Sequence, residues 1–306
     1  MRKFLFKLLI LIFPLLLFFI SMEFYCRTQT TFGIKKEFLE KYLDSIEILI
    51  FGSSHNQNAI NPEFLNRKTC NLAFGGQPIS IDYYLLDKYI EKMSRLSTVF
   101  FEVTIFRFYD DLNSSAWNGH IYSNIYNINY KVESLSLKNY LLVYSDYQFF
   151  SKIFYDYCNP NSYKYKLNRF GFVTNDFNDR FEKLKYDTLE INKTFVMTHN
   201  FDNRLNFQIN KEFYLNSIKK CLNKHIKVVL ITPPLYGTYS KHIPVNAKKE
   251  IDSLIYSFVT KYGIQYFDYS CDNRFKVYDF KNDNHLNSSG AEKFSKIINN
   301  EILEKK

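Results

Sequence analysis

The ten residues that decide the fold are Ile46-Glu47-Ile48-Leu49-Ile50-Phe51-Gly52-Ser53-Ser54-His55. Aliphatic side chains continue without a turn-forming residue as far as Gly52, as in a strand that is covered on both faces. In open parallel sheets, ligands bind just beyond the carboxyl ends of the strands. Ser53, Ser54 and His55 therefore stand where a site would be built. Alternatively, the two serines turn the chain and cap the next helix, which is a common use of serine.

Apolar runs and helical patterns extend this strand into an α/β domain. Strands are expected at residues 46–51, 69–73, 98–105, 227–232 and 265–269, and helices at residues 81–93, 211–224, 247–262 and 290–302. Because short apolar strands alternate with amphipathic helices, the pattern predicts a parallel sheet with helices on both faces.

A long segment interrupts the alternation. We expect the domain to cover residues 46–303, with an insertion at about 107–208 that is rich in Tyr, Asn and Asp and has few periodic runs. The insertion would emerge from the strand-end face that carries Ser54, where loops commonly cover a pocket and select the substrate. A packing elaboration unrelated to specificity explains the segment nearly as well.

The first 26 residues have the pattern of a membrane anchor. An uncharged run from Leu8 to Met22 ends at Glu23. The run is slightly shorter than the ~20 apolar residues that a bilayer core needs, but Phe4 to Phe6 lengthen it if the Lys7 side chain extends to the interface. No Ala-x-Ala-like cleavage site follows, so an uncleaved anchor is favoured over a signal peptide.

The distribution of charge sets the expected orientation and partners. Arg2, Lys3 and Lys7 precede the apolar run, which keeps the N-terminus in the cytoplasm. A linker at residues 27–45 and the domain after it would then be extracytoplasmic. These three side chains supply +3 of the formal charge of +9, and the remainder is spread without a long basic block. Such a distribution is typical of a solvated surface, so no nucleic-acid partner is expected.

A second cluster of polar residues lies near the C-terminus, where the chain reads Asn282-Asp283-Asn284-His285-Leu286-Asn287 and then reaches Gly290. A serine at a strand end together with a late histidine indicates nucleophilic catalysis at an acyl or ester group. Alternatively, His285 caps the helix that starts near Ser288.

The other histidines are weaker candidates. His55 follows the serine pair and could contact a substrate, but adjacent residues on a turn usually point apart, so a surface or packing role is favoured. His120, His199, His225 and His242 show no paired spacing with Cys, Asp or Glu. Neither a metal site nor a cofactor is therefore expected. The five cysteines have no repeated spacing, which argues against a disulfide scaffold.

Two blocks of the chain resemble those of the SGNH (GDSL-type) hydrolases. Gly52-Ser53-Ser54 looks like the Gly-Asp-Ser block of that family, with Ser54 at the nucleophile position. Asn71-Leu72-Ala73-Phe74-Gly75-Gly76 is similar to the second block, Asn-x-Gly-x-x-Gly, in which the last glycine donates its backbone N–H to an oxyanion. The resemblance implies an oxyanion hole formed by the N–H groups of Ser54 and Gly76.

The C-terminal segment resembles the last block of the family, Asp-x-x-His, but the chain as a whole departs from the family pattern in two places. The position three before His285 is Asn282, and the aspartate is Asp283. Either Asp283 reaches the ring, or Asn282 or a carbonyl orients it. Loss of the orienting carboxylate can lower turnover by about four orders of magnitude in a serine protease. The third block, Gly-x-Asn-Asp, is missing after the strand at 98–105, which leaves one oxyanion donor unassigned.

The anchor, the Gly-Ser-Ser block, the missing block and the long insertion together resemble a membrane-anchored SGNH subset. That subset is similar to the D-alanine transfer protein of teichoic acid synthesis and to the alginate O-acetylation proteins, which work beside membrane-bound O-acyltransferases. The resemblance implies a three-layer α/β/α flavodoxin-like fold and O-acyl transfer from an acylated donor to a cell-surface glycan through acyl-Ser54. A carbohydrate esterase with the same residues, and a catalytically silent anchored scaffold, remain as alternatives.

Overall fold

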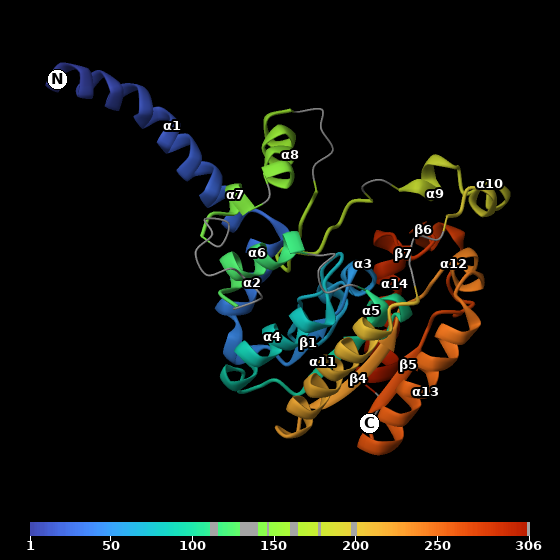
Figure 1. The fold of residues 1–306 in the computed structure, drawn as a ribbon. Coiled ribbons are helices and arrows are strands. Elements are labelled where there is room, and N and C mark those ends of the chain that lie inside the picture. The colour runs from blue at the N-terminus through green and yellow to red at the C-terminus, as the bar shows by residue number, and fades with distance from the viewer. Residues whose placement is uncertain are drawn as a thin grey trace. The chain divides into compact units, whose positions relative to one another are not determined.

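The computed structural model describes residues 1–110, 116–128, 140–145, 147–159, 165–176, 179–196 and 201–304 (Figure 1). The chain forms two compact units, of which the smaller contains residues 1–37 and 116–164 and the larger contains residues 38–115 and 165–306. The described part of the predicted insertion is thus divided between the two units. All the candidate site residues belong to the larger unit.

The larger unit is built on a five-stranded parallel sheet with the strand order β2-β1-β3-β4-β5. The strands are β1 (Ile48–Phe51), β2 (Thr69–Asn71), β3 (Thr98–Glu102), β4 (Lys227–Thr232) and β5 (Gln265–Asp268). This is the flavodoxin-like order, in which the chain runs from β1 to one edge and then returns past β1 to β3. The predicted fold class is confirmed, and the reversal creates a switch point between the carboxyl ends of β1 and β3.

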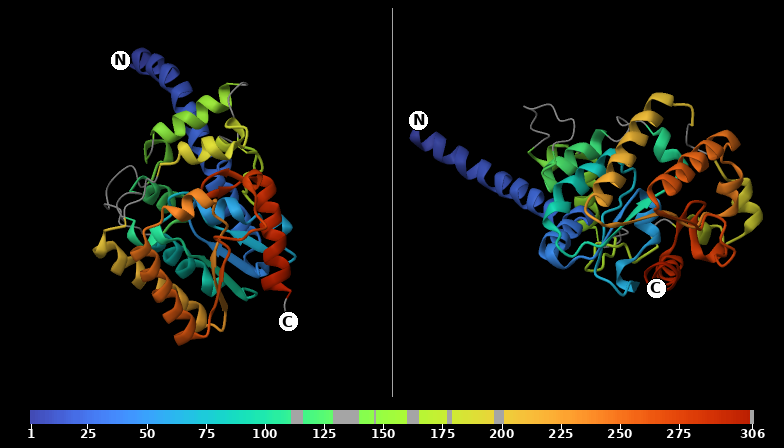
Figure 2. Two further views of the ribbon diagram at one scale, coloured as in Figure 1. Left: turned by 90° about the vertical axis from the view of Figure 1, so that its right-hand side faces the viewer. Right: turned by 90° about the horizontal axis from the view of Figure 1, so that it is seen from below.

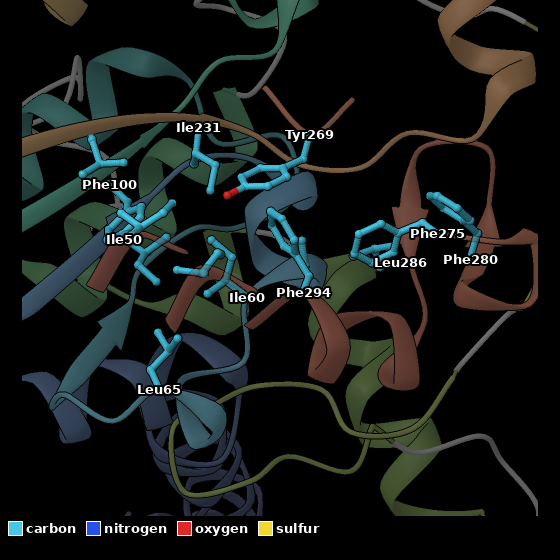
Figure 3. Close-up of a cluster of buried hydrophobic side chains, with 14 of the residues drawn as sticks. Ile50, Ile60, Leu65, Phe100, Ile231, Tyr269, Phe275, Phe280, Leu286 and Phe294 are labelled. Atoms are coloured by element: carbon cyan, nitrogen blue, oxygen red, sulfur yellow. The ribbon is translucent and has the colours of Figure 1, made fainter. Parts of the chain in front are cut away.

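Helices cover both faces of the sheet, which explains why β1 and β3 are buried along their whole length. On one face, Phe294 of α14 (Ser288–Ile298) belongs to the same buried cluster as Ile50, Phe100 and Ile231 (Figure 3). On the other face, Tyr214 of α11 (Arg204–Leu222) packs against Phe101, and the centroids of the two rings are 5.8 Å apart. Continuous apolar strands are the expected consequence of burial on two sides.

The remaining helices of the larger unit lie between the strands or follow them. They are α3 (Ser54–Ala59), α4 (Ile79–Tyr89), α5 (Ile105–Tyr109), α9 (Arg180–Lys183), α10 (Thr188–Lys193), α11 (Arg204–Leu222), α12 (Gly237–Lys241) and α13 (Val245–Tyr262), with 3-10 turns at Leu43–Ser45, Pro62–Phe64, Ile90–Lys92 and Val277–Asp279 and a π turn at Asn299–Leu303. A two-stranded antiparallel hairpin, β6 (Phe280–Asn282) and β7 (His285–Leu286), precedes α14.

Two of the element boundaries that differ from the sequence-based expectation have a clear physical reason. The strand predicted at 98–105 ends at Glu102, because the chain turns there and begins α5 three residues later. The helix predicted at 211–224 begins at Arg204, because Asn203 caps it by accepting a hydrogen bond from the N–H of Asn206.

The smaller unit contains α1 (Arg2–Thr28), α6 (Ala116–Tyr126), α7 (Leu142–Ser145) and α8 (Tyr147–Cys158), and α2 (Thr31–Lys41) includes the boundary to the larger unit. Helix α1 is continuous (Figure 2) and is long and apolar enough to cross a membrane. At its end, the Glu23 carboxylate accepts hydrogen bonds from the first N–H groups of α7 and pairs with Arg27 at 2.6 Å. Such an acidic cap favours the N-terminal end of a helix.

Candidate functional site

The turn that follows β1 places two serines in different roles. Gly52 has a φ of 151°, a conformation that a residue with a side chain rarely adopts. Ser53 is the N-cap of α3 and its hydroxyl accepts from the N–H of His55, so the helix-capping interpretation holds for this serine. Ser54 is then the first residue of α3, at the switch point of the sheet. The Ser54 hydroxyl instead contacts a side chain that is distant in sequence.

That partner is His285. The Oγ atom of Ser54 lies 2.7 Å from Nε2 of His285, although the two residues are 231 positions apart in sequence. On the other side of the ring, Nδ1 lies 3.0 Å from Oδ1 of Asn282. The same Asn282 oxygen also accepts from the backbone N–H groups of Asn284 and His285, at 3.2 and 3.0 Å. Because only an oxygen can accept all three, the amide oxygen faces the ring, Nδ1 carries the proton and Nε2 is the acceptor for the serine hydroxyl.

The β6–β7 hairpin explains how the short C-terminal segment brings Asn282 and His285 together. The two residues are paired across the hairpin, and Asp283 and Asn284 form its turn. Asn residues commonly stabilise such turns by accepting backbone N–H bonds two residues ahead. The helix cap that was considered for His285 is instead Asn287, whose side chain accepts from the N–H of Gly290 at 2.9 Å.

Asp283, the group first considered for orienting His285, directs its carboxylate elsewhere. It forms an ion pair with Arg180 of α9, which also donates to the carbonyl of Ile191. Burial raises the pKa of the Asp283 carboxyl, and the Arg180 guanidinium opposes that rise. The group that contacts the ring is Asn282, the alternative weighed from the sequence. Neighbouring positions of a tight turn cannot both direct their side chains at one imidazole.

The glycine-rich block runs beside the turn that carries Ser54. The N–H of Phe74 donates to the carbonyl of Gly52, and the N–H of Gly75 donates to the side-chain oxygen of Gln57 at 2.8 Å. A Cβ atom placed on Gly75 would lie 3.8 Å from Cβ of Ser54. The next residue, Gly76, is exposed and has a φ of 70°. Across the described ranges, the backbone N–H groups of Ser54 and Gly76 donate no internal hydrogen bond.

Sequence reasoning missed a buried carboxylate in this region. Glu102, at the end of β3, is fully buried and accepts four hydrogen bonds. Two come from the N–H groups of Ser53 and Asn56, at 2.8 and 2.9 Å, and two come from the hydroxyls of Ser53 and Thr104, at 2.5 Å each. Burial by itself would raise the pKa of Glu102, but Arg107, His55 and the hydroxyl donors together hold it below the ordinary value. The available signal was an acid at the end of an otherwise apolar strand.

A buried ion pair between Arg107 and Asp82 lies beside Glu102. Arg107 of α5 and Asp82 of α4 are joined at 2.7 Å, and both side chains are 1% exposed. The Asp82 carboxylate also accepts from the side-chain amide of Gln77 at 2.6 Å, and Arg107 donates to the backbone carbonyl of the same Gln77. Burial opposes the charged form of Arg107, but the two carboxylates raise its pKa above the ordinary value. Buried charges of both signs therefore lie beside Glu102.

His55 lies behind the Ser54–His285 pair. Its side chain is buried, and its ring centroid lies 5.2 Å from that of His285 and 5.1 Å from that of Phe106. The ring packs within the unit, as the sequence interpretation favoured. A cavity of about 90 Å³ lies beyond the carboxyl ends of β3, β4 and β5, and Phe106 and Tyr239 line it.

The described ranges place no group of three or more His, Cys, Asp or Glu side chains where it could hold a metal ion. His199 lies outside these ranges.

Comparisons with known proteins add little to this geometry. No protein-family model matches the chain, and no curated protein matches it. One similar solved structure is a protein described as a lipolytic protein of the G-D-S-L family from Desulfitobacterium hafniense DCB-2, with 12% identity, coverage of 83% of this chain and 98% of that chain, and a TM-score of 0.40. Another, described as a platelet activating factor from Streptococcus pneumonia, has 9% identity, coverage of 95% and 97%, and a TM-score of 0.43.

A third solved structure, described as an acylhydrolase from Bacteroides fragilis NCTC 9343, has 11% identity, coverage of 87% of this chain and 96% of that chain, and a TM-score of 0.41. TM-scores below 0.5 at such identities carry no argument about this chain. The functional interpretation therefore depends on the site itself.

Proposed function

We propose that this chain is a serine-dependent acyl-transfer enzyme of the SGNH type, which forms an acyl-Ser54 intermediate. The observation that carries the proposal is the 2.7 Å contact between Ser54 Oγ and His285 Nε2, with the opposite ring nitrogen held by Asn282. A hydroxyl in contact with the unprotonated nitrogen of an oriented imidazole is the arrangement that nucleophilic catalysis requires.

The reaction follows from these contacts in two halves. His285 Nε2 takes the proton from Ser54 Oγ as the oxygen bonds to the acyl carbonyl carbon, and the carbonyl oxygen becomes an oxyanion. Backbone N–H groups of Ser54 and Gly76 stabilise that charge. The carbon–oxygen bond to the leaving alcohol then breaks, His285 returns the proton to the alcohol, and acyl-Ser54 remains. A sugar hydroxyl or water, deprotonated by the same histidine, resolves the ester and regenerates Ser54.

The Asn282 contact has a mechanistic consequence. An amide oxygen fixes the tautomer and orientation of His285 as a carboxylate would, but it supplies no negative charge for the imidazolium that forms in each half-reaction. The pair would therefore be competent but slower than a Ser-His-Asp triad. Such a moderate base suits an enzyme whose donor is already an activated acyl group.

We place the reaction outside the cytoplasmic membrane, on a cell-surface glycan. The support is α1, which is long and apolar enough to span a bilayer, and the basic residues that precede its apolar run. The acceptor would be a glycan hydroxyl, the donor an acylated compound, and a membrane-bound O-acyltransferase a candidate partner.

A carbohydrate esterase is the second candidate. The observation in its favour is that Ser54 and His285 are only partly buried, so water has access to an acyl-enzyme at this position. A catalytically silent anchored scaffold is the third reading, and it predicts that Ser54 has no unusual reactivity.

Labelling with a fluorophosphonate tests the catalytic proposal. The full chain in detergent is expected to label, Ser54→Ala to lose the label, and Ser253→Ala to keep it, because Ser253 is an exposed serine on α13 whose hydroxyl donates to the Lys249 carbonyl. Equal labelling of wild type and Ser54→Ala, or no labelling of either, would contradict the proposal. Acetyl release from a model ester, with and without a glycan acceptor, then separates esterase from transferase.

A further inference from the structure

We propose that Glu102 is a positioning residue for Ser54, whose buried carboxylate holds the turn from Ser53 to Asn56 so that the Ser54 hydroxyl and backbone N–H are set for acyl transfer. The inference rests on the proposed function of Ser54. It extends that function to a residue of β3 that lies outside the three sequence blocks.

The hydrogen bonds of Glu102 surround the nucleophile on both sides along the chain. One carboxylate oxygen, Oε2, accepts from the N–H groups of Ser53 and Asn56, at 2.8 and 2.9 Å. The other oxygen accepts from the hydroxyls of Ser53 and Thr104, at 2.5 Å each. Ser54 lies between the two bonded N–H groups. A single side chain therefore joins β3 to the turn on both sides of Ser54.

The backbone at Gly52 shows how closely this carboxylate is packed. A Cβ atom at Gly52 would lie 2.4 Å from Oε2 of Glu102 and 2.8 Å from its Cβ atom, which is closer than atoms can approach. The side-chain amide of Asn56 also donates to the carbonyl of Phe51 at 2.8 Å, which ties the turn back to β1. The turn therefore has no room to slide past Glu102. The Glu102 carboxylate fixes the turn to β3, and the Asn56 amide fixes it to β1.

Removal of the carboxylate would release the turn. The N–H groups of Ser53 and Asn56 are buried, and a buried donor that loses its acceptor destabilises the conformation that holds it. Movement of the turn would shift both Ser54 atoms used in the reaction, because the hydroxyl and the N–H belong to the residue between the two bonds. A displacement of about 1 Å at a reacting group can lower a rate by about a hundredfold.

Charged and titratable groups face Glu102 from five elements, one of which is α12 with Tyr239. His55 on the nucleophile turn lies with Nδ1 3.8 Å from Oε1, and Arg107 comes from α5. Asp82 of α4 pairs with Arg107, and the Tyr214 hydroxyl of α11 donates to the backbone carbonyl of Glu102 at 3.3 Å. The carboxylate accepts three hydrogen bonds from Ser53 and Asn56 and one from Thr104, and none from the Ser54 hydroxyl or from His285. Glu102 thus acts through the turn and not on the reacting atoms.

The substitutions Glu102→Gln and Glu102→Ala separate this role from a general loss of stability. A glutamine fits the same space: its amide oxygen accepts from the two N–H groups, and its NH2 group donates to the hydroxyls of Ser53 and Thr104, which can rotate to accept. Alanine removes all four bonds. Asp82→Asn is the matched control, because it also disturbs a buried ion pair of the same network but makes no contact with the turn.

All variants are compared as full chains in detergent, by kcat and KM on an activated acetyl ester and by thermal unfolding. Glu102→Ala is expected to lose at least about a hundredfold in kcat with KM within about threefold of wild type, and Glu102→Gln to recover to within about tenfold. Asp82→Asn should lower the unfolding temperature but keep the wild-type kcat. The proposal is overturned if Glu102→Ala keeps kcat within about threefold, or if Glu102→Gln is as impaired as Glu102→Ala and shifts the pH profile, since charge rather than position would then matter.

A second measurement separates failure of this inference from failure of the proposed function. If the wild type neither labels nor hydrolyses esters, the proposed function falls, and the positioning role is read from histidine 15N NMR instead. The Nε2 signal of His285 is expected to move in Glu102→Ala, because the hydrogen bond from Ser54 is lost, and to stay in Asp82→Asn. An unchanged signal in Glu102→Ala would overturn the inference independently of activity.

Discussion

Replacing Asn282 with aspartate should increase the rate of acyl transfer. The side chain already accepts hydrogen bonds from the His285 ring and from two backbone N–H groups through one oxygen, so an aspartate can make the same bonds without rearrangement. The new feature is a negative charge 3.0 Å from Nδ1 of the ring. That charge stabilises the imidazolium formed when Ser54 is deprotonated, and stabilisation of charge that appears only in the transition state raises kcat.

The magnitude follows from Coulomb's law at that distance. Two unit charges 3.0 Å apart attract by about 1.4 kcal/mol in bulk water and by about 5.5 kcal/mol at an effective dielectric constant of 20. Asn282 and His285 are both partly exposed, so the value for water is the appropriate estimate. About 1.4 kcal/mol corresponds to a gain of about tenfold in kcat. The same energy should move the acidic limb of the kcat/KM profile upward by about one pH unit.

The assay is the pH dependence of ester hydrolysis by the full chain between pH 5 and about 9. The gain should be seen at the alkaline plateau and should vanish on the acidic limb, because the added charge also favours the protonated ring there. Asn284→Asp is the matched control, since it places the same charge in the hairpin turn at a residue that contributes only its backbone N–H to the Asn282 oxygen. The reasoning is refuted if Asn282→Asp changes neither plateau nor limb, or if Asn284→Asp has the same effect.

Three further predictions follow from other contacts of the larger unit. Asp283→Asn should keep kcat within a few-fold of wild type and lower the free energy of unfolding in urea by about 1 kcal/mol, because the carboxylate pairs with the partly exposed Arg180 rather than with His285. A loss of kcat as large as that of His285→Ala would show that Asp283 acts on the ring. Gly290→Ala should destabilise the fold by about 2 kcal/mol or more, because the new Cβ would lie 2.1 Å from the Asp279 carbonyl oxygen, and an unchanged melting temperature would contradict this close approach. Because the pKa of Glu102 lies below its ordinary value of 4.5, its contribution to stability is present above that pH and is lost as the pH falls through the lowered value; urea titrations below pH 4 should show a smaller decline for Glu102→Gln, and equal slopes would argue against the shift.

The sheet was predictable because its strands are short, apolar and buried on two faces. The apolar run before Gly52 ends where β1 ends, at Phe51. The predicted strand at 227–232 ends where β4 ends, at Thr232. The order of the strands is not a local property, since it depends on which edge each crossover helix selects. The α/β class therefore follows from periodicity, whereas the switch point between β1 and β3 is seen only in the folded sheet.

The site divides in the same way. Ser54 and His285 were candidates from residue type and spacing, and the structure places their side-chain atoms 2.7 Å apart. The choice between Asn282 and Asp283 was open, because it depends on which position of the hairpin turn faces the ring. Glu102 was missed because its partners, Ser53 and Asn56, lie about fifty residues earlier on another strand-to-helix turn.

The sequence by itself determined an apolar N-terminal helix, alternating strands and helices, a serine pair after a buried strand and a histidine in a polar C-terminal segment, because these features depend on residues that are close along the chain. Only the tertiary structure decided that the Ser54 hydroxyl, which the family resemblance had indicated, lies against His285, that an amide orients the ring, and that a buried glutamate holds the turn around Ser54. Each of these depends on the direction of side chains from elements joined through the parallel sheet and its helices. Such directions are set by packing and by the satisfaction of buried donors, which no local pattern of residues encodes.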